Sequence, residues 1–192
     1  MRLGAVILAA GAGARLGGCA KAMLRVGDET YLARIARIAR RAGVQAAVVV
    51  VGPPYGTTVG ALARQLGLDV VDNARPERGM ASSVALGFDA IQAYDVDAAW
   101  LWPVDHARVE LETLELLKGA LGDHAAAQPR HGDRGGHPPL IARSLWPQLA
   151  ACGSAPEGAR GVLRAANVIQ VPVDDVGVVR DVDTPGDLRE LA

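Results

Sequence analysis

Short apolar runs alternate with longer amphipathic stretches along most of the chain. Residues 4–9 (GAVILA) and 46–51 (AAVVVV) are continuous apolar runs, typical of strands that are buried on both faces. Between them, residues 31–42 (YLARIARIARRA) place apolar side chains on one side and arginines largely on the other at helical spacing, and Gly43 follows as a helix end. The pattern predicts a strand, a helix and a second strand.

The same alternation continues through the middle of the chain. We expect helices at residues 57–66, 80–93 and 110–121, and strands at 68–71 and 98–102. This β-α-β rhythm favours a mostly parallel sheet with right-handed crossovers.

The rhythm changes after residue 121. Residues 125–137 are polar and Gly-rich, and their length predicts a functional loop rather than a simple connection. A short strand at 140–142, two helical stretches and a β-rich tail at 168–173 and 178–181 are expected after it. The whole pattern predicts an α/β protein of three layers, α/β/α, around a mostly parallel, Rossmann-like sheet, with one domain over residues 1–192.

Composition narrows the classes of partner. The 192 residues carry 20 Lys+Arg against 21 Asp+Glu, a net charge of −1, which argues against a nucleic-acid partner or a polybasic membrane surface. No apolar run approaches the ~20 residues of a membrane span. The two cysteines, Cys19 and Cys152, are too few and too distant for a disulfide scaffold. We therefore expect a cytoplasmic protein.

The strongest local signal is the small-residue segment 8–17 (LAAGAGARLG), directly after the first expected strand. A dinucleotide fingerprint would need a third glycine where Leu16 stands, and a Walker loop would need Gly-Lys-Ser/Thr around Lys21. Both readings fail. What remains is a loop with two cations, Arg15 and Lys21, which suits a triphosphate, although an ordinary turn with solvated cations has the same composition.

A second candidate is residues 73–83 (NARPERGMASS), which run from a strand end to a helix start. Ser82 and Ser83 in the first helical turn are suited to donate to nucleotide oxygens. Taken alone, the segment is better explained by helix capping.

Acidic residues give a third signal. Asp105 follows the expected strand 98–102, where open α/β sheets place ligands, and Mg²⁺ in such sites takes one or two carboxylates plus substrate phosphates. Asp181 and Asp183 alternate as in a strand, so we expect Asp183 to face the pocket and Asp181 to face away. The four histidines lack the ligand spacing of a zinc site, and His137 is better explained as part of a shaped substrate loop.

These motifs, in this order, resemble the MobA-like nucleotidyltransferase superfamily, and most of all its molybdenum cofactor cytidylyltransferase (MocA-like) branch. The resemblance rests on LAAG-x-G-x-R-x-G with a following Lys, N-x5-GM-x-SS, the strand-end Asp, GHP and D-x-D-T-P. It covers nearly the whole chain and implies the fold of the nucleotide-diphospho-sugar transferases.

The resemblance implies transfer of CMP from CTP to the molybdopterin cofactor, with release of pyrophosphate and Mg²⁺ as cofactor. It also implies a role for each matching residue. The triphosphate and its chemistry fall to Arg15 and Lys21, the metal to Asp105 and Asp183, the acceptor to His137 and Pro138, and the nucleotide also to Leu8, Ala9, Ala10, Gly11, Gly13, Asn73, Gly79, Ser82 and Ser83.

Departures from the family pattern leave alternatives open. The family usually has Asp-Gln-Pro where this chain has Asp105-His106-Ala107, and Pro76 stands where an aromatic residue is common. One alternative is a guanylyl- or sugar-phosphate-type transferase that uses another nucleoside triphosphate or acceptor. Another is a non-catalytic partner that hands cofactor to a molybdenum enzyme through residues 125–137. An NAD-type oxidoreductase has only the glycine loop in its favour.

Overall fold

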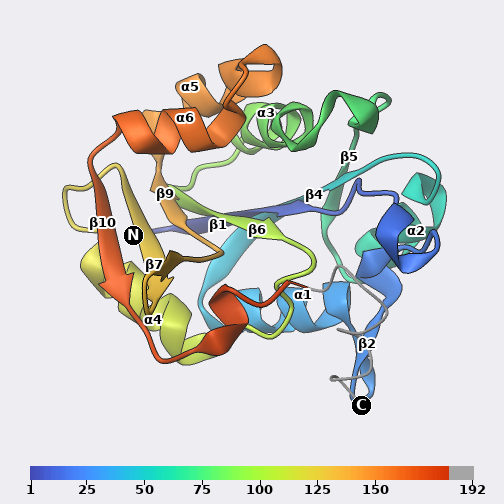
Figure 1. The fold of residues 1–192 in the computed structure, drawn as a ribbon, viewed down its shortest axis with the longest axis horizontal. Helices are drawn as coiled ribbons and strands as arrows, with labels where there is room; N and C mark the ends of the chain where they lie inside the picture. Colours follow the sequence, from blue (N-terminus) through green and yellow to red (C-terminus); the bar gives the residue numbers. More distant parts are fainter. Residues whose placement is uncertain (182–192) are drawn as a thin grey trace.

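The computed structural model describes residues 1–181, apart from the side chain of Arg15. Within this range the main sheet has eight strands in the order β10-β7-β9-β6-β1-β4-β5, with β8 paired to β7 (Figure 1). Its strands are β1 (Leu3–Leu8), β4 (Val44–Val51), β5 (Asp69–Asp72), β6 (Ala98–Pro103), β7 (Ala126–His131), β8 (Arg134–Gly135), β9 (Leu140–Ala142) and β10 (Val168–Pro172). A separate hairpin pairs β2 (Arg25–Val26) with β3 (Glu29–Thr30).

Helices cover both faces of the sheet. They are α1 (Tyr31–Arg41), α2 (Gly56–Gln65), α3 (Met80–Ile91), α4 (Leu111–Ala120), α5 (Trp146–Ala151) and α6 (Gly158–Ala165). Side chains of α1, α2 and α4 join one hydrophobic cluster, and those of α3, α5 and α6 join the other (Figure 1). Strand β1 contributes side chains to both clusters. Ala5 and Ile7 point to one face of the sheet, and Val6 and Leu8 point to the other. The expected three-layer α/β/α fold is confirmed.

The sheet is mostly parallel, as predicted. Strand β1 pairs in parallel with β4 on one side and with β6 on the other, while β9 runs antiparallel between β6 and β7. After β1 the chain adds β4 and β5 on one side of this strand and then crosses to add β6 on its other side. At such a change of direction a crevice forms beyond the carboxyl ends of the two neighbouring strands, here β1 and β6. These two ends are joined there, because Leu8 lies opposite Pro103 and the Val104 N–H donates to the Leu8 carbonyl over 3.0 Å.

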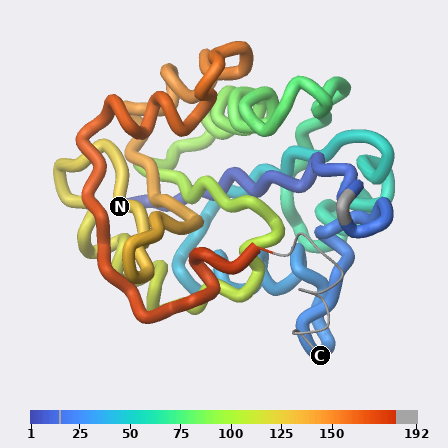
Figure 2. Tube along the Cα trace, in the orientation of Figure 1, coloured from blue at the N-terminus to red at the C-terminus, as the bar shows by residue number. Residues whose placement is uncertain are grey.

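Two expectations about the last third of the chain are wrong. Residues 125–137 are not a long loop, because β7 and β8 form a hairpin within them and β7 pairs with both β9 and β10. Residues 178–181 are not a strand, because Val176–Val178 forms a 3-10 turn that the Asp175 carboxylate caps. This turn brings the chain back beside the sheet, where the His137 N–H donates to the Val178 carbonyl over 2.8 Å (Figure 2). None of the described helices combines the length and apolar character needed to cross a membrane.

Candidate active site

A cavity of about 380 Å³ opens beyond the carboxyl ends of β1 and β6. It gathers segments that are far apart in the sequence: the turn after β1, the turn after β6, the start of α3 and the chain near its end. Of the residues predicted to bind nucleotide or metal, the structure places the following in its lining: Leu8, Ala9, Ala10, Gly11, Lys21, Gly79, Ser83 and Asp105.

The turn after β1 presents unpaired backbone donors. Within the described chain, the N–H groups of Ala10, Gly11 and Gly13 have no hydrogen-bond acceptor, and Gly11 lines the cavity. Gly13 has a φ of 58°, and a Cβ on it would lie 2.1 Å from the Cys19 carbonyl oxygen, so the loop folds back only because this residue is glycine. Successive free N–H groups after a strand suit an anion such as a phosphate.

Lys21 and Asp105 meet at this cavity. The Lys21 Nζ lies 2.9 Å from the Asp105 Oδ2, and the two side chains are 15% and 20% exposed. Lys21 begins a 3-10 turn, Lys21–Met23, whose next residue Ala22 is buried, so the lysine is held at the cavity wall. Asp105 is held in turn by the strand end, since the His106 N–H donates to the Pro103 carbonyl over 3.1 Å.

A second carboxylate lines the same cavity. Asp181 is exposed and contributes to the wall that Lys21 and Asp105 share. The expectation that Asp181 faces away is therefore wrong, because it assumed the alternation of a strand and residues 178–181 do not form one. Asp183 lies outside the described residues, as does the side chain of Arg15, so both assignments stay predictions.

Asn73 organises the start of α3. Its Nδ2 donates to the hydroxyls of Ser82 and Ser83, each over 2.9 Å, and Ser82 donates to the Gly79 carbonyl over 2.8 Å. All three polar side chains are buried, with Asn73 only 3% exposed. Ser83 lines the cavity and Ser82 does not. Asn73 and Ser82 therefore lie behind the wall of this cavity, and Ser83 lies in the wall itself.

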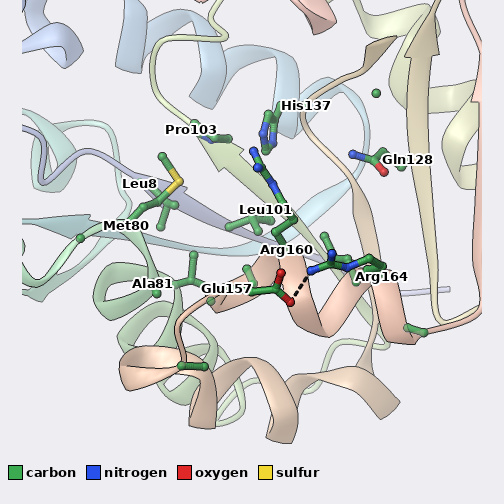
Figure 3. A pocket seen from close by; sticks show the side chains of 18 of the residues that line it. Leu8, Met80, Ala81, Leu101, Pro103, Gln128, His137, Glu157, Arg160 and Arg164 are labelled. Atoms are coloured by element: carbon green, nitrogen blue, oxygen red, sulfur yellow. Dashed lines mark ion pairs between the residues drawn. The ribbon is translucent and has the colours of Figure 1, made fainter. Parts of the chain in front are cut away.

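A larger cavity of about 780 Å³ adjoins the first, and the two share Leu8, Gly79, Met80 and Pro103 in their walls. Figure 3 shows the side chains around this larger cavity, with His137 at one end and α6 along one side. Pro138 is buried and lines neither of these two cavities.

His137 is a neutral imidazole in this setting. Burial and, to a smaller extent, the nearby His106 lower its pKa from 6.5 to about 4, so the ring is uncharged at pH 7. The ring centroids of His106 and His137 are 4.9 Å apart, and the Nδ1 of His137 is buried without a hydrogen-bond partner. His106, which replaces the glutamine of the family pattern, is thus packed behind the larger cavity.

The sequence reasoning missed several residues at these cavities. Gln128, Arg160 and Arg164 line the larger one, and Arg78 lies where it can contact a ligand there. The four-residue spacing of Arg160 and Arg164 on one helix was a signal, but no motif marked it. Gln128 stands in the segment that was expected to be a loop.

The carboxylates fit a divalent cation that is held partly by substrate. Within residues 1–181, no group of three or more His, Cys, Asp or Glu side chains is arranged to hold a metal alone. Asp105 and Asp181 on the wall of one cavity instead provide the one or two carboxylates that Mg²⁺ takes when phosphates complete its shell.

The fold and the site together define a nucleotide-binding transferase of the α/β class. Residues 5–171 match the MobA-like NTP transferase domain family. The chain belongs to this family and is a nucleotidyltransferase.

Solved structures share the fold of this chain. Rv0371c from Mycobacterium tuberculosis H37Rv is 26% identical, with a TM-score of 0.82 over 100% of this chain and 97% of that one. Its manganese complex gives 24% identity and a TM-score of 0.79, covering 100% and 98% of the two chains. Molybdopterin-guanine dinucleotide biosynthesis protein A from Archaeoglobus fulgidus, at 18% identity and a TM-score of 0.68 over 100% and 96%, shares the fold. Comparison with curated protein sequences gives no significant match.

Proposed function

We propose that this protein transfers CMP from CTP to the molybdopterin cofactor and releases pyrophosphate in a Mg²⁺-dependent reaction. The observation that carries the proposal is the meeting of free backbone N–H groups, Lys21 and Asp105 around one cavity. A triphosphate is the ligand whose charge matches this combination of donors, cation and metal-binding carboxylate.

In this proposal the triphosphate lies along the N–H groups of Ala10, Gly11 and Gly13, with Arg15 and Lys21 over its oxygens. Asp105 and Asp183 hold the Mg²⁺, which when bound withdraws charge from the phosphates and so favours departure of pyrophosphate. Asp181 is a further candidate for that role, because it lines the same cavity. Ser83 keeps its hydroxyl hydrogen for the nucleotide, since Asn73 donates to its oxygen.

The acceptor needs no strong base. A terminal phosphate already carries an anionic oxygen, which attacks the α-phosphorus of CTP while the bond to the β-phosphate breaks. The work of the protein is then positioning and charge stabilisation rather than proton removal. A neutral His137 beside the acceptor agrees with this scheme, because it adds no charge and its pKa of about 4 makes it a weak base.

The departure at His106-Ala107 favours one alternative, a related transferase with another base or acceptor, because His106 packs against His137 at the larger cavity. The name of the Archaeoglobus protein refers to molybdopterin-guanine dinucleotide, which makes GTP the first competitor to test. The manganese bound by the Rv0371c complex supports a divalent cation. A non-catalytic role in handing cofactor to a molybdenum enzyme stays the alternative if no turnover is found.

The test is pyrophosphate release from the purified protein with Mg²⁺, molybdopterin cofactor and each nucleoside triphosphate in turn. We expect CTP to give the fastest release, and no release without the acceptor. A preference for GTP would establish the guanylyl alternative. Absence of turnover with every nucleotide would end the catalytic claim.

A further inference from the structure

Three arginines surround the larger cavity, and their charges are not all compensated. Arg164 forms an ion pair with Glu157, the single carboxylate in the lining (Figure 3). Arg160, one turn earlier on α6, makes no ion pair or hydrogen bond with any residue that the structure describes. Arg78 donates from its Nη2 to the neutral hydroxyl of Ser154 over 2.7 Å. The cavity therefore carries two positive charges, on Arg160 and Arg78, that no described carboxylate neutralises.

Arg160 is directed toward the cavity and not away from the protein. In Figure 3 its guanidinium extends from α6 toward His137, and its charge is one of the influences that lower the pKa of that histidine. Gly158 sets the start of the helix. Its φ is 50°, and a Cβ on it would lie 2.7 Å from the Cβ of Ala81, so α6 packs tightly on α3 with Arg160 above the cavity.

The other residues in the lining indicate which chemical groups a ligand of this cavity would carry. Leu8, Val84, Leu101 and Leu163 form apolar wall. At one side two amides form a polar edge, where the Gln170 Nε2 donates to the Gln128 Oε1 over 3.0 Å and Gln128 Nε2 donates to the Gly136 carbonyl over 3.3 Å. Such a lining fits a ligand that has apolar and polar sides and carries an anionic group.

The geometry points to Arg160 as the group that binds the phosphate of the acceptor, a phosphomonoester whose body lies against the apolar and amide-lined walls. The identity of that acceptor as molybdopterin rests on the proposed function. A guanidinium binds two phosphate oxygens in parallel, which leaves the third oxygen for attack. The two cavities share Gly79 and Met80 in their walls, so a phosphate held in the larger cavity lies in the space that adjoins the nucleotide cavity.

The test measures binding without catalysis. The fluorescent oxidised form of molybdopterin is titrated onto the protein, both with its phosphate and after phosphatase treatment. Arg160→Met is compared with the native protein and with Arg41→Met, a change at an exposed arginine at the end of α1. We expect Arg160→Met to weaken binding of the phosphorylated form by about 10- to 100-fold, as for loss of a charged hydrogen bond. Arg41→Met should not change binding, and the dephosphorylated form should bind the native protein and Arg160→Met equally.

Parallel titrations separate the failure modes. If glucose 1-phosphate, and not oxidised molybdopterin, binds in an Arg160-dependent manner, the phosphate site stands while the acceptor in the proposed function is wrong. If binding depends on Arg160 but the protein releases no pyrophosphate, the phosphate site likewise stands, while the reaction in the proposed function is wrong. Equal binding of the phosphorylated form to native protein and Arg160→Met, or no binding of either phosphomonoester to the native protein, would overturn the inference. Thermal stabilisation by CTP, unchanged in Arg160→Met, shows that the variant is folded.

Discussion

At the scale of single residues, the contact between Lys21 and Asp105 matters most for the proposed reaction. Lys21→Met and Asp105→Asn are each expected to lower kcat/KM by about 10²–10³, the usual effect of losing one charged group that stabilises a transition state. Stability should change by about 1 kcal/mol or less, because the ion pair is only partly buried. Steady-state pyrophosphate release and urea unfolding measure the two effects on the same protein.

Lys118→Met provides the matched control. Lys118 pairs with Glu115 on the outer surface of α4, so its loss removes a lysine and an ion pair far from the cavities. Activity should remain that of the native protein. Near-native turnover in Lys21→Met would show that the lysine has no role in the reaction.

The lowered pKa of His137 predicts that the free energy of unfolding depends on pH. Its pKa is lowered from 6.5 to about 4 by burial and by His106, so the unfolded chain binds this proton more readily than the folded one. This contribution to stability is fully present above pH 6.5, is lost as the pH falls from 6.5 to 4, and amounts to roughly 3 kcal/mol in total. His137→Phe keeps the ring and removes the titration, so the free energy of unfolding should fall less between pH 6.5 and 4. Identical pH profiles for the two proteins would contradict the assignment.

The sequence predicted Lys21 and Asp105 as cavity residues from their positions. Lys21 follows the glycine-rich segment after the first strand, and Asp105 follows a buried strand. The sequence misplaced Asp181, because the alternation of a strand was assumed where the chain makes a 3-10 turn. It missed Arg160, whose role depends on α6 packing against α3 beside the larger cavity, a tertiary relation that no local pattern encodes. The roles of Arg15 and Asp183 remain predictions from the motif alone.

At the scale of elements, the packing of α3 on β1 depends on one glycine. A Cβ on Gly87 would lie 2.3 Å from the Val6 Cγ1 and 3.1 Å from the Val50 Cγ2, so no side chain fits between helix and sheet. Gly87→Ala is expected to destabilise the protein by about 1–3 kcal/mol through overpacking, despite the better helix propensity of alanine. Because α3 carries Ser83 and Met80 to the cavities, nucleotide affinity should fall as well. Urea unfolding and CTP titration test both effects.

Gly119→Ala in α4 is the control for helix propensity. No atom lies within 4 Å of a Cβ at Gly119, so the same change there should stabilise the protein by up to about 1 kcal/mol. Destabilisation of both variants to the same degree would show that the close contact of Gly87 with Val6 does not decide the outcome.

The central strands β1, β4 and β6 were predictable from the sequence and β7 was not. Strands β1, β4 and β6 are buried on both faces, so burial itself imposes the continuous apolar runs by which they were recognised. Strand β7 contains Gln128, Pro129 and Arg130, which have little strand propensity, and it forms because β9 and β10 pair with it on either side. The same pairing brings Gln128 and His137 to the larger cavity.

At the scale of the whole molecule, the reversal of strand order at β1 explains why two cavities adjoin. The carboxyl ends of β1 and β6 are hydrogen-bonded neighbours, so whatever binds beyond β1 lies against whatever binds beyond β6. In the proposed reaction this neighbourhood brings the α-phosphate of the nucleotide and the phosphate of the acceptor together, with Gly79 and Met80 between the two sites.

The central claim is that the smaller cavity binds a metal-complexed nucleoside triphosphate. The most direct measurement is a crystal structure with CTP and Mn²⁺, in which anomalous scattering locates the metal. We expect the anomalous peak about 2.1 Å from an Asp105 carboxylate oxygen, the distance typical of a small octahedral cation. The triphosphate should lie against the N–H groups of Ala10, Gly11 and Gly13. A metal peak away from Asp105, or a nucleotide bound outside this cavity, would contradict the account.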